Sequence, residues 1–210
     1  MKEVVLLQKP NITMFYDVIP SEMCDEIVEK HVSDGMNPIA GKQSRQESYA
    51  QVTERVEDRG ISLGMSPRHY DYLADKVAKC ARIPHQHIEA IDIYNYNTGQ
   101  FLDLHHDYCY FPEYINYYRH GGDRVGTGIF YFNDDYEGGD TYFPKFNISV
   151  KPKKGAFLYF RQGYLDEQVN WDTIHGSSEI TKGTKWIAAC FFSDRPRVGY
   201  TSRSEGVRFL

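Results

Sequence analysis

The chain is poor in cysteine and has no long apolar run. Its 210 residues include only 4 cysteines, and no two of them form a Cys-x-x-Cys pair. This spacing argues against a disulfide framework and a zinc-thiolate site, and it favours free thiols in a reducing compartment. The N-terminal apolar run is too short for a signal-peptide core, and no run could span a bilayer. We therefore expect a cytoplasmic protein with no membrane partner.

An excess of positive charge is also missing. The net charge is −5 and no basic run occurs, so we expect no nucleic-acid partner. The chain is instead rich in aromatic residues and glycine, with 17 Tyr, 12 Phe and 17 Gly, and 41% of its residues are hydrophobic. This composition favours strands and turns around a sizeable core.

The apolar pattern predicts two helices followed by about eight short strands. The first helix should cover about 21–31, and Ser66-Pro67 is a good N-cap and first-turn pair for a second over about 67–81. From Ile88 onward, apolar and polar residues alternate with period two. We therefore expect an α+β fold whose strands curl into a barrel or a jelly-roll sandwich.

A histidine and an aspartate occupy alternate positions at the end of one predicted strand. Because residues i and i+2 of a strand share a face, His105 and Asp107 should point the same way and His106 the opposite way. With a second imidazole from a distant strand, such as His175, they would form a 2-His-1-carboxylate triad. This triad suits non-haem Fe(II), because it leaves coordination positions open for substrate and O₂.

Lys185 stands ten positions after His175. If the turn at 181–183 is a hairpin apex, His175 lies opposite residue 189, and Lys185 shares the face of both. The level of His175 and the level of Lys185 are then four residues apart along the strand, or roughly 13 Å at about 3.3 Å per residue. A dicarboxylate that chelates a metal at one end could span this gap to the ammonium. A solvated lysine is the alternative, but the spacing from His175 favours the site.

The predicted ligands belong to a longer ordered series of motifs. In chain order these are Tyr96-Asn97-Thr98-Gly99-Gln100, His105-His106-Asp107, Arg124-Val125-Gly126-Thr127, Tyr131-Phe132-Asn133, Gly138-Gly139-Asp140-Thr141-Tyr142-Phe143-Pro144, Pro152-Lys153-Lys154-Gly155, His175 and Lys185-Trp186. Their order and spacing resemble the prolyl 4-hydroxylase group of Fe(II)- and 2-oxoglutarate-dependent dioxygenases. The resemblance implies a double-stranded β-helix (jelly-roll) core with N-terminal flanking helices.

The resemblance also implies a division of the single domain, 1–210, into three parts. Residues 1–87 would supply a strand, the helices and a substrate-side loop. Residues 88–193 would form the catalytic β-helix core, and 194–210 a C-terminal tail.

Carried over position by position, the resemblance assigns roles to seven residues. The iron ligands would be His105, Asp107 and His175. Lys185 would pair with the distal carboxylate of 2-oxoglutarate, and the residues lining the cosubstrate pocket would be Tyr96, Tyr131 and Thr141. Core packing is the alternative role for Tyr131. Ascorbate is the expected reductant.

The implied reaction is hydroxylation of an unactivated C–H bond by O₂ and 2-oxoglutarate, with release of succinate and CO₂. The expected substrate is a prolyl residue in a peptide or protein. Free proline or another small molecule is an alternative, and a catalytically silent β-helix binding domain is another. The Tyr-rich insertion at 108–120 and the loop at 38–60 would form the two walls of the substrate groove. The alternative is that the aromatic rings of the insertion only pack against one another. Oligomeric state is left open.

Several departures from the family pattern, which include Ser178-Glu179 in place of the usual Cys/Glu-Pro, bear on the substrate. Ser177 stands where the family usually has glycine, Leu102 replaces an aromatic residue, and Phe191 replaces a second tryptophan. All four predicted metal and cosubstrate-carboxylate positions match the pattern, so the departures leave the reaction class as expected and put the identity of the substrate in doubt.

Overall fold

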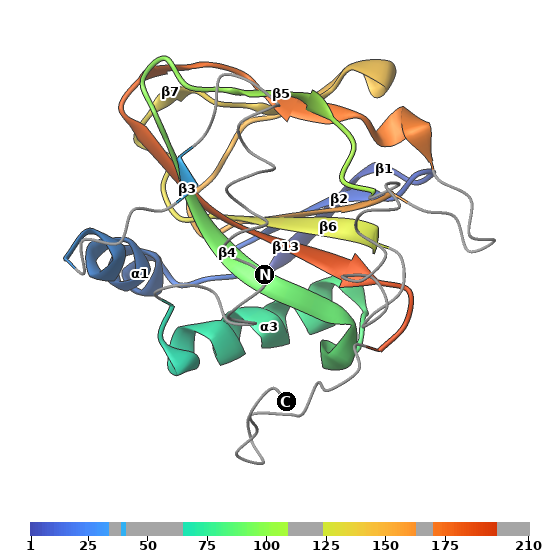
Figure 1. The fold of residues 1–210 in the computed structure, drawn as a ribbon, viewed down its shortest axis with the longest axis horizontal. Coiled ribbons are helices and arrows are strands. Elements are labelled where there is room, and N and C mark those ends of the chain that lie inside the picture. The colour runs from blue at the N-terminus through green and yellow to red at the C-terminus, as the bar shows by residue number, and fades with distance from the viewer. Residues whose placement is uncertain (34–38, 41–64, 109–123, 163–169, 197–210) are drawn as a thin grey trace.

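Two sheets pack face to face in the computed structural model (Figure 1), which describes residues 1–33, 39–40, 65–108, 124–162 and 170–196. The seven-stranded sheet consists, from edge to edge, of β1 (Lys2–Leu7), β2 (Ile12–Tyr16), β10 (Phe157–Arg161), β6 (Arg124–Tyr131), β13 (Thr184–Ser193), β4 (Ile88–Asn97) and β3 (Ile39–Ala40). The four-stranded sheet consists of β5 (Leu102–His105), β11 (His175–Ser177), β8 (Thr141–Phe143) and β9 (Ile148–Val150). A third pair joins β12 (Ile180–Lys182) to β7 (Glu137–Gly138).

Two helices cover the outer face of the seven-stranded sheet (Figure 1): α1 (Ser21–Ser33) and α3 (Pro67–Ala81). Helix α3 begins where expected, because the Ser66 hydroxyl accepts a hydrogen bond from the His69 amide and Pro67 pre-sets the first turn. Its buried stripe of Leu73, Val77 and Cys80 packs on the sheet. The 3-10 helices are η1 (His85–His87), η3 (Pro144–Phe146) and η4 (Trp171–Thr173).

Alternation along β13 separates two hydrophobic cores. Trp186, Ala188 and Cys190 belong to the core between the sheet and the helices, whereas Ile187 belongs to the core between the two sheets. Burying a side chain of the size of Ile187 stabilises the fold by about 1.5–3 kcal/mol. Lys185 has the same parity as Ile187, so the alternation directs a buried lysine toward the space between the sheets.

The predicted α+β architecture and both predicted helices are present. The first strand was expected only from residue 12, but Lys2–Leu7 is also a strand because it pairs antiparallel with β2 at the sheet edge. The expected loop at 38–60 and the Tyr-rich insertion lie mostly outside the described residues, as does most of the tail. Among the helices that the structure describes, none is long and apolar enough to cross a bilayer.

Candidate metal centre and cosubstrate pocket

Three side chains from two neighbouring strands meet at one end of the four-stranded sheet. The Nε2 atom of His105 lies 3.1 Å from Oδ1 of Asp107, and the Nε2 atom of His175 lies 3.3 Å from Oδ2 of the same carboxylate. The ligand atoms of the three residues all lie within 4.8 Å of one another. Within the described part of the chain, this is the only such group of three.

Strand pairing explains why these three side chains lie close together. Antiparallel pairing of β5 and β11 places His175 directly opposite His105, and their ring centroids are 4.4 Å apart. Asp107 follows two residues after His105, just past the end of β5, and turns to the same side. The predicted parity of the three neighbours is therefore confirmed.

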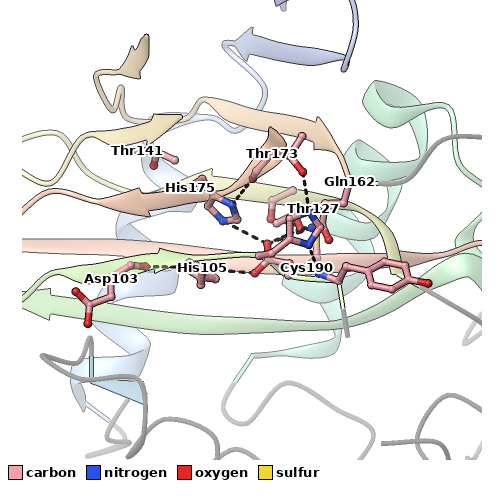
Figure 2. Close-up of polar contacts among 12 residues, drawn as sticks. Asp103, His105, Thr127, Thr141, Gln162, Thr173, His175 and Cys190 are labelled. Atoms are coloured by element: carbon pink, nitrogen blue, oxygen red, sulfur yellow. Dashed lines mark hydrogen bonds and ion pairs between the residues drawn. The ribbon is translucent and has the colours of Figure 1, made fainter. Parts of the chain in front are cut away.

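The two opposed imidazoles are fixed by their other ring nitrogens (Figure 2). His105 donates its Nδ1 hydrogen to the carbonyl of Asp103 at 2.8 Å, and His175 donates its own to the carbonyl of Thr173 at 3.1 Å. These bonds hold the two rings in place, with both Nε2 atoms facing the carboxylate. Bonds of this kind are usual for metal-ligating histidines.

His106 points away from this group, as expected, and is buried. Its Nε2 hydrogen is directed at the carbonyl of Asn170 and the hydroxyl of Thr173, at 2.8 and 2.9 Å. Its Nδ1 accepts a hydrogen bond from the Tyr108 amide at 3.0 Å. Both ring nitrogens are thus used in holding the segment of η4 against the end of β5.

Asp107 is surrounded by groups that offset the cost of burying its carboxylate. Thr127 donates a hydrogen bond to Oδ2 at 2.7 Å, and the Gln162 amide donates to the same oxygen at 3.2 Å and contacts Thr127 (Figure 2). Burial by itself would raise the pKa of Asp107, but the charge and hydrogen bonds of His175 and His105 outweigh it and hold the pKa well below its usual range. Two imidazole nitrogens and one ionised carboxylate form the donor set that Fe(II) takes in non-haem oxygenases.

The second predicted group lies between the two sheets around Lys185. This side chain is only 1% exposed, and its ammonium donates hydrogen bonds to the carbonyl of Gly139 at 2.6 Å and the hydroxyl of Ser177 at 3.1 Å. It also lies 5.6 Å from the ring centroid of Tyr96 and 5.7 Å from that of Tyr131. Burial lowers the pKa of Lys185 to about 7.

Thr141 completes this second group. Its hydroxyl lies 2.9 Å from that of Tyr131, and it pairs across the strands with Ser177. Since Ser177 contacts Lys185 and follows His175 by two residues on β11, the two groups are joined through one short strand. All seven predicted site residues therefore lie in the two linked clusters.

The predicted hairpin between the strands of His175 and Lys185 is wrong. Strand β11 pairs with β5 and β8, whereas β13 pairs with β4 and β6 in the opposite sheet. The intervening β12 pairs with β7, so the chain crosses from one sheet to the other instead of turning back on itself. Lys185 therefore reaches β11 across the sandwich.

The sequence does not predict two of the side chains that contribute to the site. Gln162 is fully buried beside Asp107 but belongs to none of the motifs, and nothing in its neighbourhood of the sequence distinguishes it. In the sequence, Ser177 stands out only as a departure from the family pattern. Its contact with Lys185 depends on the packing of two sheets, which no local pattern reports.

Comparisons with known proteins agree with this fold and identify the family. The family model described as the 2OG-Fe(II) oxygenase superfamily matches residues 91–193. Prolyl 4-hydroxylase 1 of Arabidopsis thaliana is 30% identical over 203 residues, covering 89% of this chain and 70% of that protein. Probable prolyl 4-hydroxylase 9 of the same plant is 27% identical, covering 91% and 71%. The chain belongs to the prolyl 4-hydroxylase family of 2OG-Fe(II) oxygenases.

Solved structures show the same architecture. The viral collagen prolyl hydroxylase of Paramecium Bursaria Chlorella virus-1, crystallised with 2OG, superposes with a TM-score of 0.63 at 18% identity, covering 87% of this chain and 94% of the viral chain. A prolyl hydroxylase from Trichoplax adhaerens, solved with a hypoxia inducible factor peptide fragment, gives a TM-score of 0.56 at 15% identity, covering 90% and 86%. The predicted double-stranded β-helix is confirmed.

Proposed function

We propose that this chain is a Fe(II)- and 2-oxoglutarate-dependent dioxygenase that hydroxylates prolyl residues in a peptide or protein, releasing succinate and CO₂. In this proposal His105, Asp107 and His175 hold the iron, and Lys185 pairs with the distal carboxylate of 2-oxoglutarate. Tyr96, Tyr131 and Thr141 line the cosubstrate pocket. The observation that carries the proposal is the buried ammonium of Lys185, which contacts the same short strand that presents His175.

The protein's own part in the reaction is to hold and orient its reactants. When bound, the iron and the keto acid supply the oxidising chemistry, with O₂ as the oxidant. The Nδ1 bonds of the two histidines keep their Nε2 lone pairs available, and Thr127 holds the carboxylate of Asp107 in one orientation. Lys185 would fix the far end of the cosubstrate, because a compact ammonium in a closed pocket suits a single carboxylate.

One buried ion pair close to the strand position of Thr127 favours a peptide over a free amino acid as substrate. Arg124 donates three hydrogen bonds to the buried carboxylate of Glu89 at 2.8 to 3.0 Å. Its guanidinium lies 3.8 Å from the ring centroid of Phe191, which pairs across the strands with Thr127. Because Glu89 already neutralises this cation, a free carboxylate gains little from it. A peptide substrate has an uncharged peptide bond in place of that carboxylate, so it does not need a cation to bind it.

Other parts of the proposal rest on the family and on composition. We assign the catalytic core to 88–193, with 1–87 as the supporting and substrate-side segment and 194–210 as a tail. Ascorbate is the proposed reductant that keeps the iron in its ferrous state. A cytoplasmic location is proposed because Cys24, Cys80 and Cys190 are free thiols, which suits a reducing compartment.

Two measurements test the function. The purified protein with Fe(II), 2-oxoglutarate and ascorbate is incubated with a library of proline-containing peptides, and the products are searched for a mass increase of one oxygen atom. Succinate is measured in parallel, with His175→Ala as the inactive control. Hydroxylated peptide together with succinate supports the proposal. No succinate from an iron-loaded protein would overturn the enzymatic assignment and leave a binding domain.

Free proline is the alternative substrate and is included in the same screen. Hydroxylation of free proline, with no product from any peptide, would contradict the peptidyl assignment. If the carboxylate of free proline then pairs with Arg124, it competes with Glu89, and Glu89→Gln should lower the KM for proline.

A further inference from the structure

The ammonium of Lys185 is buried between the two sheets, and the described residues give it no anionic partner. Among the described residues, no carboxylate lies within ion-pair distance of it, and its two hydrogen-bond acceptors, Gly139 and Ser177, are both neutral. An ammonium has three hydrogens to donate, and a buried charge is costly unless it is paired. The arrangement therefore provides for an anion that arrives from outside the chain.

Gly139 and Ser177 form a fixed cradle for this ammonium. Gly139 has a φ of +71°, a conformation that favours glycine, and a Cβ added there would meet Ile180 and would lie 3.2 Å from Cδ of Lys185. Ser177 is 7% exposed and is held on β11 between neighbouring strands by its pairing with Thr141 and Leu102. The position of the hydroxyl is thus set by the sheet.

Within the described parts of the chain, the Ser177 hydroxyl has no good acceptor of its own. It accepts the hydrogen bond from Lys185 at 3.1 Å, but its own hydrogen has only long contacts, 3.4 Å to the carbonyl of Gly139 and 3.4 Å to that of Ser178. Good O–H···O hydrogen bonds are about 2.7–2.8 Å long. A buried hydroxyl that donates this weakly gains free energy when a stronger acceptor comes within reach.

We propose that Ser177 is a binding residue for the distal carboxylate of 2-oxoglutarate, to which its hydroxyl donates a hydrogen bond while Lys185 supplies the charge. This inference rests on the proposed function and adds to it a residue that the family pattern does not supply, because glycine is usual at this position. The donors, Nζ of Lys185 and Oγ of Ser177, are 3.1 Å apart, so one carboxylate can receive a hydrogen bond from each.

Binding measurements that need no turnover test this role. The protein is loaded with Mn(II), and the Kd of 2-oxoglutarate is compared with that of 2-oxobutyrate, which has the same chelating end and no distal carboxylate. We expect Ser177→Ala and Ser177→Gly to weaken 2-oxoglutarate binding about tenfold, since a hydrogen bond to a charged group is lost. Binding of 2-oxobutyrate should change less than about twofold. Ser33→Ala, an exposed serine in the last turn of α1 on the outer side of the seven-stranded sheet, is the control and should leave both constants unchanged.

A second background separates direct contact from an effect through the lysine. If Ser177 touches the carboxylate itself, Ser177→Ala still weakens 2-oxoglutarate binding severalfold when Lys185 is already methionine. No further loss in that background would overturn the proposal, because Ser177 would then act only by positioning Lys185. Equally weaker binding of both keto acids, or a loss of Mn(II) affinity, would also overturn the proposal. Either result would show that the substitution disturbs the structure in general.

These outcomes distinguish failure of this inference from failure of the proposed function. If the wild-type protein binds no 2-oxoglutarate in the presence of Mn(II), the function itself fails. If the wild type binds it and Ser177→Ala binds it equally well, the function stands and the role of Ser177 is refuted.

Discussion

His105 and His175 face each other across two antiparallel strands, with ring centroids 4.4 Å apart and both Nε2 atoms directed at the carboxylate of Asp107. Each ring is held by a hydrogen bond from Nδ1 to a backbone carbonyl two residues before it in the chain. Backbone hydrogen bonds and strand pairing therefore position all three side chains.

Loss of either facing imidazole should abolish metal binding. We expect His105→Ala and His175→Ala to weaken Mn(II) binding by at least about 100-fold, since one of three ligands is removed. The matched control is His106→Gln, which alters the intervening histidine that points away from the carboxylate. It should bind Mn(II) within a few-fold of wild type, as measured by calorimetry. Loss of binding in His106→Gln alone would contradict the proposed assignment of ligands.

The hydroxyl of Thr127 should matter for metal affinity through Asp107. Thr127→Val keeps the shape of the side chain and removes its 2.7 Å hydrogen bond to Oδ2. Loss of such an orienting bond typically costs 10–100-fold in metal affinity. Thr141→Val removes a hydroxyl that contacts Tyr131 in the second cluster, so it should spare Mn(II) binding and weaken 2-oxoglutarate. Identical effects of the two variants would show that the clusters are not separable.

Binding of 2-oxoglutarate should depend on the protonation of Lys185. Burial lowers the pKa of this lysine to about 7 in the free protein, and a bound carboxylate should raise it again. Above pH 7, binding then takes up a proton, so the affinity should fall as pH rises from about 7 toward 9. Calorimetry of the Mn(II)-loaded protein in buffers of different ionisation enthalpy measures this proton uptake. Lys185→Met should abolish it, and uptake that persists in that variant would assign it to another group.

The same lysine should cost stability. Its folded pKa lies below the usual value of 10.5, so the unfolded chain binds more protons between pH 7 and 10.5. The contribution of Lys185 to the free energy of unfolding therefore rises with pH across this window and is most unfavourable below pH 7. Lys185→Met should raise the free energy of unfolding at pH 7 by about 2 kcal/mol or more, since one pKa unit corresponds to about 1.4 kcal/mol. Urea unfolding at pH 7 and 9 measures it, and the gain should shrink at pH 9.

Two glycines with positive φ offer a matched test of the cradle. At Gly99, with a φ of +85°, an added Cβ meets nothing within 4 Å, so Gly99→Ala should cost only backbone strain of about 1 kcal/mol. At Gly139 an added Cβ also presses on Ile180 and on the stem of Lys185. Gly139→Ala should therefore destabilise the protein further and weaken 2-oxoglutarate binding at least several-fold. Equal Kd values for the two variants would argue that the Gly139 carbonyl is not needed to hold the lysine.

Local patterns were sufficient for several parts of this protein. Ser66-Pro67 marks the start of α3, because capping and proline geometry act within one turn of the chain. Likewise, the side-chain period of a strand is two, so the shared direction of His105 and Asp107 and the opposite direction of His106 follow from parity. The metal-ligand motif was readable for this reason, and the ordered series of motifs identified the family.

Tertiary structure decided which strands meet. The predicted hairpin placed His175 and Lys185 on one face of one sheet, whereas they belong to opposite sheets and are joined through Ser177. Gln162 follows β10 in the seven-stranded sheet and Asp107 follows β5 in the other sheet, so the contact between these residues, 55 positions apart, depends on the packing of the two sheets. The sequence by itself therefore determined which side chains carry the chemistry, since their types and alternation are local properties. Their partners depend on sheet pairing and on the packing of two sheets, which arise only when distant segments bury a common core.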